Sequence, residues 1–380
     1  MNARQRFYET MHKGHPDRFC YYEWHGYWPD TIARWHQEGL KEAVDMDAML
    51  KLLPDILLFS HGAHPMGKEL DRVFGFDGHS GVSLNLGPIP NYLTRTISEE
   101  GPYRTWVDYL GVTRRSIKDH YHMPEYLVFP VETRDDFREF KARYDPHDMR
   151  RYPLTWGEEL FAALRDRDCP LGMGFDGFFG KPMEIIGLRK LLYAYYDDPL
   201  LIHDINDFWA DFLIEFFGPV LEHVVPDYVT IGEDVAYKTS MHISSQHFQE
   251  FMYPYLRRVV DFFHAHGVDT IFVDSDGHVD ELIGLCMDAG INGSAPLEVA
   301  SDVDAVALAK RYGQDLLMIG NIDKRALSAD RETIRREALP KLAFFRERGG
   351  FIPCIDHRVS PDIPLDNYHY YLELVKSFEG

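Results

Sequence analysis

The sequence predicts an α/β protein built as a (β/α)8 TIM barrel, with N-terminal helices and a β-rich insertion near residues 86–130. Three observations predict this fold. Short apolar runs alternate with longer stretches of helical periodicity through the second half of the chain, an order typical of parallel sheets. The runs are apolar throughout, as in strands whose two faces are both covered. At least seven strand–helix units fit a barrel better than an open doubly wound sheet, and no GxGxxG motif follows a strand.

The elements are predicted in chain order as follows. Residues 19–24 (FCYYEW) form a first strand, and the later apolar runs predict strands over 171–175, 227–232, 270–274, 293–299, 316–320 and 351–355. Helices are predicted over 244–267, 279–290, 302–313 and 331–350, with C-terminal caps at Gly267, Gly290, Gly313 and Gly349. Residues 86–150 interrupt this order with strand-like segments joined by glycine turns, so we expect an insertion within one domain spanning 1–380.

Composition limits the possible partners and the compartment. The formal net charge is −21, which disfavours binding to the phosphate backbone of nucleic acids. The four cysteines (Cys20, Cys169, Cys286 and Cys354) are far apart in sequence, which fits a reducing compartment better than a disulfide framework. The N-terminus has no apolar signal-peptide region, and no run of about 18 apolar residues predicts a membrane span. We therefore expect a cytoplasmic protein that acts on a small molecule.

Polar side chains follow nearly every predicted strand. Active sites of barrel enzymes lie at the carboxyl ends of the strands, so these side chains would converge on one mouth. Carboxylates so close together raise one another's pKa or require a cation. The residues are Glu23, His25, Asp176, Glu233, Asp234, Asp274, Asp276, Glu298, Asn321, Asp323, Asp356 and His357.

Asp274, Asp276 and His357 are the predicted metal ligands. Asp274 and Asp276 are two residues apart on an extended chain, which points their side chains the same way. His357 would lie across the mouth, and two carboxylates with one imidazole suit zinc first, with manganese or iron as alternatives. The other possibility is that this cluster binds a polar substrate directly.

Several polar residues also have a purely structural explanation. Asp302 and Asp323 fit the N-caps of the helices that follow them, and His278 fits a helix start. Cys354 fits a small buried apolar side chain. His25 is equally consistent with the core edge and with the site.

Residues from about 226 to 375 resemble the uroporphyrinogen decarboxylase superfamily. The matching pieces are GEDVAYKTSMHISSQHFQEFMYPYLRRVV, IFVDSDG, YGQDLLMIGNIDKRAL and GGFIPCIDHRVSPDIPLDN. This superfamily includes the decarboxylase and the cobalamin-dependent methyltransferases, and the resemblance implies a (β/α)8 barrel. The decarboxylase branch also implies a homodimer.

The resemblance bears on the metal site. The methyltransferase branch carries a zinc site of the form His-x-Cys with a later cysteine; Asp274, Asp276 and His357 occupy these positions here. The ligand set is harder than thiolates, which favours a less thiophilic metal or weaker zinc binding. Glu233 or Asp234 would complete the site or act as general acid, with Glu298 as a supporting catalytic residue.

The resemblance to the decarboxylase fails at the substrate-binding segment. That enzyme uses an arginine-rich N-terminal phrase to hold the substrate's propionates, whereas residues 21–30 (YYEWHGYWPD) contain no arginine. Instead, Trp24, Tyr27 and Trp28 would line the mouth or simply pack there. The predicted substrate-binding residues are Glu23, Trp24, His25, Tyr27, Asp176 and Asn321.

We therefore expect methyl transfer between a small methylated substrate and a corrinoid carried by a partner protein. The first alternative is a decarboxylase or lyase acting on a smaller carboxylated molecule. The second is a binding protein without catalytic activity.

Overall fold

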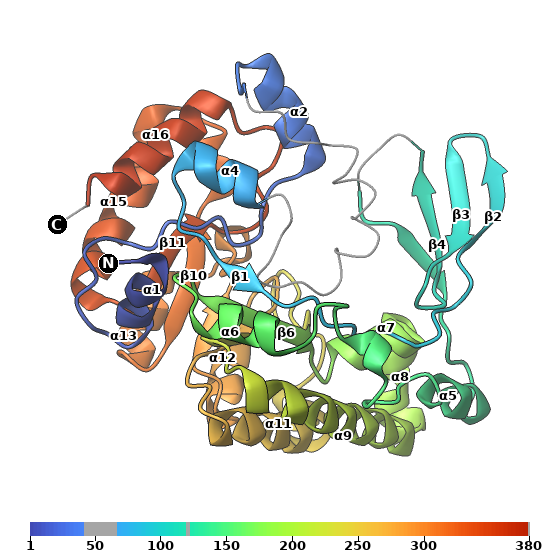
Figure 1. The fold of residues 1–380 in the computed structure, drawn as a ribbon. Helices are drawn as coiled ribbons and strands as arrows, with labels where there is room; N and C mark the ends of the chain where they lie inside the picture. The colour runs from blue at the N-terminus through green and yellow to red at the C-terminus, as the bar shows by residue number, and fades with distance from the viewer. Residues whose placement is uncertain (42–66, 119–121, 379–380) are drawn as a thin grey trace.

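Seven parallel strands form one curled sheet at the centre of the protein (Figure 1). The computed structural model describes residues 1–41, 67–118 and 122–378. The strand order β1-β6-β7-β8-β9-β10-β11 follows the chain, with helices on the outside of the sheet. The predicted fold class is therefore confirmed. The strands are β1 (Ser80–Gly81), β6 (Leu171–Asp176), β7 (Tyr228–Gly232), β8 (Ile271–Asp274), β9 (Gly293–Ala295), β10 (Leu317–Ile322) and β11 (Phe351–Ile355).

Six of the predicted strands correspond to β6 through β11, although β9 stops at Ala295, four residues before the predicted end. The predicted strand over 19–24 is wrong, because this segment carries no strand ladder. It contacts residues at both edges of the sheet without forming a ladder. The carbonyl of Tyr21 accepts a hydrogen bond from the amide of Asp77, just before β1, and the carboxyl of Glu23 accepts one from the amide of Ile355 in β11.

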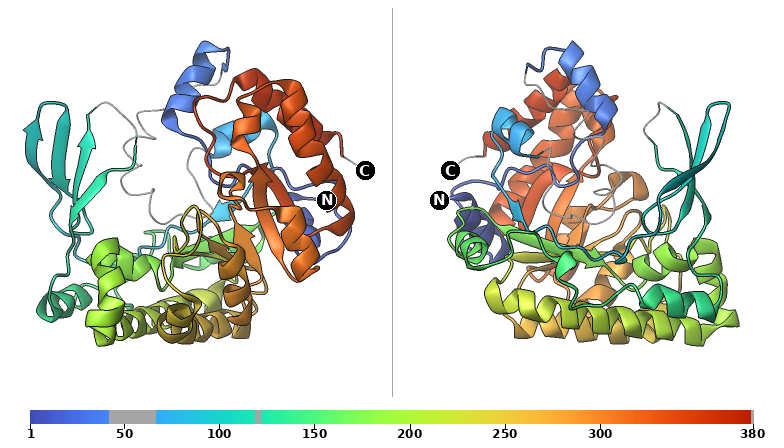
Figure 2. Two further views of the ribbon diagram at one scale, coloured as in Figure 1. Left: turned by 180° about the vertical axis from the view of Figure 1, so that it is seen from behind. Right: turned by 45° about the vertical axis from the view of Figure 1, so that its right-hand side comes forward.

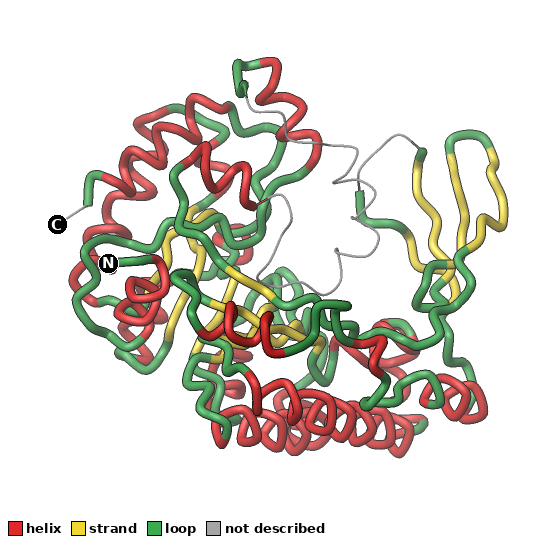
Figure 3. Tube along the Cα trace, in the orientation of Figure 1, coloured by secondary structure: helices red, strands yellow, loops and turns green. Residues whose placement is uncertain are grey.

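The helices surround this sheet, as the views in Figures 2 and 3 show. The predicted helix over 244–267 contains a π-helical turn, Phe248–Met252, between α10 and α11. All four predicted glycine caps have positive φ, which confirms that these helices end where expected. The helices are α1 (Ala3–Met11), α2 (Pro29–Gln37), α4 (Gly67–Phe74), α5 (Arg134–Lys141), α6 (Glu158–Arg165), α7 (Gly180–Ile186), α8 (Leu188–Asp197), α9 (Pro199–His223), α10 (Ser245–His247), α11 (Tyr253–Ala265), α12 (Asp280–Asp288), α13 (Ala305–Tyr312), α14 (Lys324–Leu327), α15 (Arg331–Arg348) and α16 (Leu365–Lys376).

A separate apolar cluster fills the interior of the curled sheet. Tyr228 and Phe272 point inward from β7 and β8, and Trp24 packs with its ring centroid 5.2 Å from that of Tyr228. Helix α1 adds Phe7, whose ring lies 5.2 Å from Tyr228, and Met11. The interior is thus a packed core, and α1 covers it at the amino-terminal ends of the strands.

The predicted insertion contains a four-stranded antiparallel sheet in the order β2-β3-β4-β5. Its strands are β2 (Arg95–Glu100), β3 (Tyr103–Val107), β4 (Thr113–Ile117) and β5 (Glu125–Val128); residues 119–121 of the predicted insertion lie outside the described residues. This sheet stands to one side of the barrel in Figure 1. Among the described residues, no helix has the length and apolar character needed to cross a membrane.

Candidate active site

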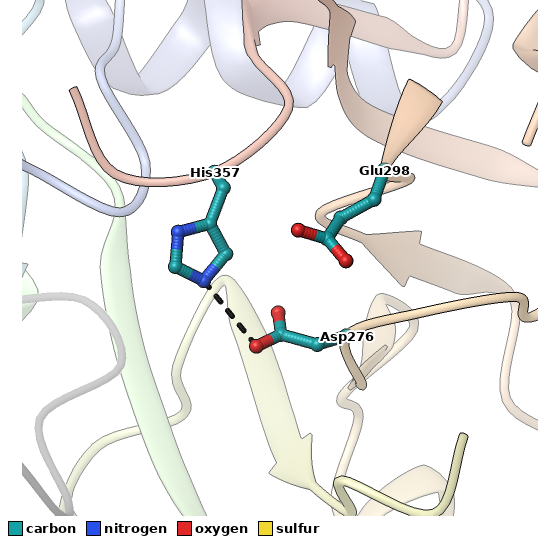
Figure 4. A group of neighbouring side chains, drawn as sticks. All are labelled: Asp276, Glu298 and His357. Carbon is teal, nitrogen blue, oxygen red and sulfur yellow. Dashed lines mark hydrogen bonds and ion pairs between the residues drawn. The ribbon is translucent and has the colours of Figure 1, made fainter. Parts of the chain in front are cut away.

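Three side chains from three strand ends converge in Figure 4: Asp276 after β8, Glu298 after β9 and His357 after β11. One ligand atom from each lies within 4.8 Å of the others. His357 Nε2 is 3.3 Å from Asp276 Oδ2. Burial works against the charge of Asp276, but the hydrogen bond and charge of His357 outweigh it and lower the pKa of Asp276. Two predicted ligands therefore lie together, with Glu298 as the third member of the group.

The loop that carries Glu298 is fixed by two buried polar residues. Asp356 is fully buried and accepts hydrogen bonds from the amides of Val299 (2.9 Å) and Lys324 (3.0 Å). Asn321 accepts from the amide of Ala305. Its side-chain amide donates to two carbonyls of the same loop, of Leu297 and Val303 (both 2.9 Å). Asn321, predicted to bind substrate, thus contacts backbone atoms of this loop.

Glu298 itself is held from two sides. Its Oε2 accepts a hydrogen bond from the amide of Gly277 at 3.0 Å, and Lys324 Nζ lies 3.5 Å from its Oε1. Gly277 has φ of +87°, and a Cβ there would lie 2.6 Å from the carbonyl oxygen of Tyr237, so glycine is required. The turn after β8 therefore links the Asp276 segment to Glu298.

Asp274, the remaining predicted ligand, lies outside the group of three. It is the last residue of β8 and is 7% exposed. Burial, with added repulsion from Asp276 and Asp234, raises the pKa of Asp274 well above its usual value, against the attraction of Arg358. Its carboxyl group faces the cavity described next.

A cavity of about 580 Å³ lies between the strand ends and the inserted sheet. Its apolar wall includes Tyr126 and Phe129, which belong to or directly follow β5. Its acidic lining comprises Asp176, Glu184, Glu233, Asp234 and Asp274. Of its two arginines, Arg114 is paired with Asp108 at 2.5 Å. The cavity is therefore rich in carboxyl groups and aromatic surface.

Asp234 connects this cavity to the group of three. Its carboxyl group accepts a hydrogen bond from the backbone of Asp276. Burial and the nearby charge of Asp276 raise the pKa of Asp234 to about 6. A carboxyl group with such a pKa exchanges its proton near neutral pH, which suits acid–base work. The prediction of Asp234 as a catalytic residue has this geometry behind it.

Glu233 has a different set of contacts. It is fully buried and accepts hydrogen bonds from the amides of Phe178 (3.0 Å), Phe179 (2.8 Å) and Gly180 (3.4 Å) at the start of α7. Burial raises its pKa to about 7, although these amides favour the charged form. Glu233, also predicted to be catalytic, therefore fixes the helix that borders the cavity.

The N-terminal candidates lie in three different environments. Glu23 accepts a hydrogen bond from Tyr368 Oη at 2.9 Å, and Tyr368 is bonded in turn to Tyr27. Tyr27 is 4% exposed and packs among aromatic rings, so it does not line the cavity. Trp24 belongs to the interior cluster. His25 stacks on His357, with ring centroids 5.8 Å apart, and is the N-terminal candidate next to the group of three.

The structure also tests the residues for which a purely structural role was predicted. Asp323 is the N-cap of α14, as predicted, whereas the N-cap of α13 is Asp304 and not Asp302. Asp302 has a left-handed backbone with φ of +60° and ends a short 3-10 helix, so it cannot serve as that cap. His278 precedes α12 and its Nδ1 lies 2.7 Å from the carbonyl of Ser301. Cys354 is 1% exposed in the interior cluster, as predicted.

Comparison with known proteins gives the family. Residues 123–378 match the family model described as Uroporphyrinogen decarboxylase (URO-D). The chain belongs to the uroporphyrinogen decarboxylase family. A uroporphyrinogen decarboxylase from Hydrogenobaculum sp. (strain Y04AAS1) is 26% identical over 258 residues, 63% of this chain and 67% of that protein. One from Anaeromyxobacter sp. (strain Fw109-5) is 23% identical over 267 residues, 66% of this chain and 70% of that protein.

A solved structure shares the whole fold of this family member. A methyltransferase from Methanosarcina mazei superposes with a TM-score of 0.64 over 100% of both chains, at 12% sequence identity. At this identity the likeness establishes the fold alone. It places the present chain on a barrel scaffold that also occurs in a methyltransferase.

The donor set of this family member fits a divalent metal. A tetrahedral ion with bonds of about 2.1 Å separates neighbouring donor atoms by about 3.4 Å. The 3.3 Å between His357 Nε2 and Asp276 Oδ2 matches that separation. One imidazole with two carboxylates is a common ligand combination for zinc, manganese or iron. Glu298 is the third possible donor, with one oxygen within 4.8 Å of a ligand atom of each of the other two residues.

Sequence reasoning missed several residues at this site. Arg358 directly follows His357, and its pKa is lowered by burial despite the opposing charges of Asp276 and Asp274. Glu184 and Lys181 lie on α7 and form an ion pair beside the cavity. The signal that could have found them is a lysine and a glutamate three residues apart in an otherwise apolar helix, GKPMEII. Arg114 enters from β4 of the insertion, for which the sequence contains no comparable signal.

Proposed function

We propose that this protein is a metal-dependent methyltransferase-type enzyme of the uroporphyrinogen decarboxylase family. It would move a methyl group between a small methylated substrate and a corrinoid carried by a partner protein. The observation that supports this proposal is the convergence of Asp276, Glu298 and His357 within 4.8 Å at the carboxyl ends of the strands. Asp276 Oδ2, Glu298 Oε1 or Oε2 and His357 Nε2 would hold the metal. A metal there supplies Lewis-acid activation of the atom that bears the methyl group.

Side chains around the proposed metal site would bind the substrate, hold a proton and orient His357. The cavity of about 580 Å³ has room for a small organic substrate, which Tyr126 and Phe129 would hold on their ring faces. Asp234 lies between the metal ligands and the cavity, where it can hold a proton near neutral pH. His25, stacked on His357, fixes the orientation of that imidazole.

The lining also argues against a substrate with many carboxylates. Five acidic residues line the cavity, and one of its two arginines is paired with Asp108. A tetrapyrrole with several propionates would bring its negative charges against these groups without enough guanidinium partners. Methyl transfer to a corrinoid therefore fits this lining better than uroporphyrinogen decarboxylation does.

A metal and turnover experiment tests the proposal. The protein purified under reducing conditions is expected to retain about one equivalent of zinc, manganese or iron, measured by elemental analysis. With cob(I)alamin and a panel of methyl ethers, thioethers and amines, formation of methylcobalamin is followed by its visible absorption. Asp276→Ala should lose the metal and the activity, because one of three ligands is gone.

The control is Asp315→Ala, which changes a carboxylate that is 82% exposed and remote from the mouth. It should retain both metal and activity. Metal retention by Asp276→Ala would contradict the ligand assignment. Absence of cobalamin methylation across the panel, in protein that holds its metal, would contradict the proposed reaction.

A further inference from the structure

Lys181, on α7, is a charged residue in the interior of the protein. Its side chain is 1% exposed, and Nζ lies 4.5 Å from the ring of Trp209 and 5.1 Å from that of Tyr144. Removing an ammonium group from water costs several kcal/mol unless a carboxylate compensates for it. The group of three metal-ligand candidates does not involve this residue, so its presence beside the cavity calls for an explanation.

Glu184 is that carboxylate. Lys181 Nζ lies 2.6 Å from Glu184 Oε1 and 3.3 Å from Tyr144 Oη. Burial works against the charged ammonium, but the charge of Glu184 outweighs it and raises the pKa of Lys181. Lys181 and Glu184 therefore form a largely buried ion pair on one turn of α7, and Glu184 lines the cavity.

Asp176 is the neighbour of Glu184 on the cavity wall. Asp176 ends β6, and both carboxyl groups line the cavity. Asp176 Oδ2 and Glu184 Oε2 are each buried, and no described residue donates a hydrogen bond to either oxygen. The two side chains are instead within hydrogen-bonding reach of each other. Because an ionised carboxylate only accepts, such a contact requires that one of the two carry a proton.

The neighbours of the two carboxyl groups indicate which of them carries the proton. Glu184 is next to Lys181, so it keeps the negative charge, and the proton belongs to Asp176. Burial, and then the charge of Glu184, raises the pKa of Asp176 well above its usual value, in agreement with this assignment. Among the described residues, the charged and titratable groups around the pair are Lys181, Tyr144, Asp234 and Tyr126, with the Arg114–Asp108 ion pair of the inserted segment.

We propose that Asp176 is the general acid of this cavity, with Lys181 and Glu184 as the positioning residues that keep it a neutral carboxylic acid. The assignment of the reaction rests on the proposed methyl transfer. The bond between the methyl carbon and its heteroatom breaks, and the electron pair stays on the heteroatom. That atom takes the proton from the Asp176 carboxyl group, while the methyl group goes to the cobalt nucleophile. Asp176 is left ionised and recovers its proton from solvent through the cavity.

Infrared spectroscopy tests the protonation state without substrate, metal or corrinoid. At pH 7.5, the difference spectrum between wild type and Asp176→Asn should contain the C=O stretch of one protonated carboxylic acid. Lys181→Met, which fills the same space without charge, should change the frequency or intensity of this band, because the ion pair that holds Glu184 beside Asp176 is lost. Lys190→Met is the matched control, since Lys190 of α8 donates hydrogen bonds to the backbone carbonyls of Val131 and Glu132.

Kinetics tests the role of the acid. Asp176→Asn should lower kcat of cobalamin methylation by about 100- to 10,000-fold, the usual range for loss of a general acid, with a much smaller change in KM. Lys181→Met should lower kcat and displace its pH profile, whereas loss of mere packing would leave the profile in place. Lys190→Met should match wild type in both measurements.

Two results would overturn the assignment: a difference spectrum without an acid band, or Asp176→Asn with the kcat of wild type. Failure of the proposed function gives a different pattern. In that case the infrared bands appear as expected, and the wild-type protein with its metal bound transfers no methyl group.

Discussion

The carboxylate of Glu233 borders the cavity, yet its contacts are the three backbone amides at the start of α7. The carboxyl group has little space in which to move, because Gly177 packs directly against it. A Cβ at Gly177 would lie 2.0 Å from Glu233 Oε1. The hydrogen bonds that Glu233 accepts from these amides orient α7, and α7 carries Lys181 and Glu184. One buried carboxylate thereby sets the position of the neighbouring ion pair.

The raised pKa of Glu233 predicts a pH dependence of stability. Its pKa rises from 4.5 to about 7 on folding, so the folded state binds the proton more tightly than the unfolded state. This contribution is complete below about pH 4.5 and is lost as pH rises through 7, a change of about 3 kcal/mol. Urea unfolding at pH 5 and pH 8 should show a larger fall for wild type than for Glu233→Gln. Equal falls for the two proteins would contradict the prediction.

The metal-ligand candidates show what residue patterns can predict. Asp276 and His357 were predictable because polar residues after parallel strands meet at one edge of the sheet. Asp274 was grouped with them on the assumption that the chain stays extended. The strand ends at Asp274 and the chain turns through Gly277 at φ of +87°, so the alternation of side chains does not continue. Glu298 takes the place next to Asp276 as a result of that turn, which no spacing rule encodes.

At the scale of elements, the segment between β9 and α13 depends on a single side chain of β10. Asn321 makes three hydrogen bonds to backbone atoms of residues 297–305, and Glu298 lies within this segment. Asn321→Ala should lower the free energy of unfolding by about 3 kcal/mol, because these buried groups lose their partners. It should also raise the dissociation constant for zinc at least tenfold, measured by competition with a chromogenic chelator.

Asn206→Ala provides the matched comparison. Asn206 is equally buried and binds the carbonyls of Phe178 and Phe251, away from the Glu298 segment. It should lose similar stability while leaving zinc affinity unchanged. If both variants weaken zinc binding alike, general destabilisation is the cause and the specific role of Asn321 is refuted.

Elements were predictable where local pattern and tertiary contacts agree. The strands β6 to β11 are short apolar runs between helices, and burial on both faces selects such runs. Residues 19–24 have the same composition, but they contact the two sheet edges through the Tyr21 carbonyl and the Glu23 carboxyl group instead of a backbone ladder. The π-helical turn at Phe248–Met252 also escaped prediction, because its periodicity differs from that of an α-helix by a single inserted residue.

At the scale of the whole molecule, charge limits the substrate. The chain carries a net charge of −21, and its cavity is lined by five carboxyl groups. We expect the protein not to decarboxylate uroporphyrinogen under conditions in which a decarboxylase of the family converts the substrate completely. The measurement is chromatography of the porphyrins obtained by oxidising the reaction mixture. Release of coproporphyrinogen at a comparable rate would refute this expectation and favour uroporphyrinogen decarboxylation over methyl transfer.

The covered end of the barrel has a kinetic consequence. Phe7 and Met11 of α1 pack into the interior cluster at the amino-terminal side, so these side chains block passage through the interior of the curled sheet. In the proposed reaction, the small substrate and the corrinoid protein would both approach from the carboxyl ends of the strands. A bulky carrier protein seated there would shut in whatever arrived first. Steady-state measurements should therefore reveal a compulsory order of addition, with the small reactant first and its product last to depart.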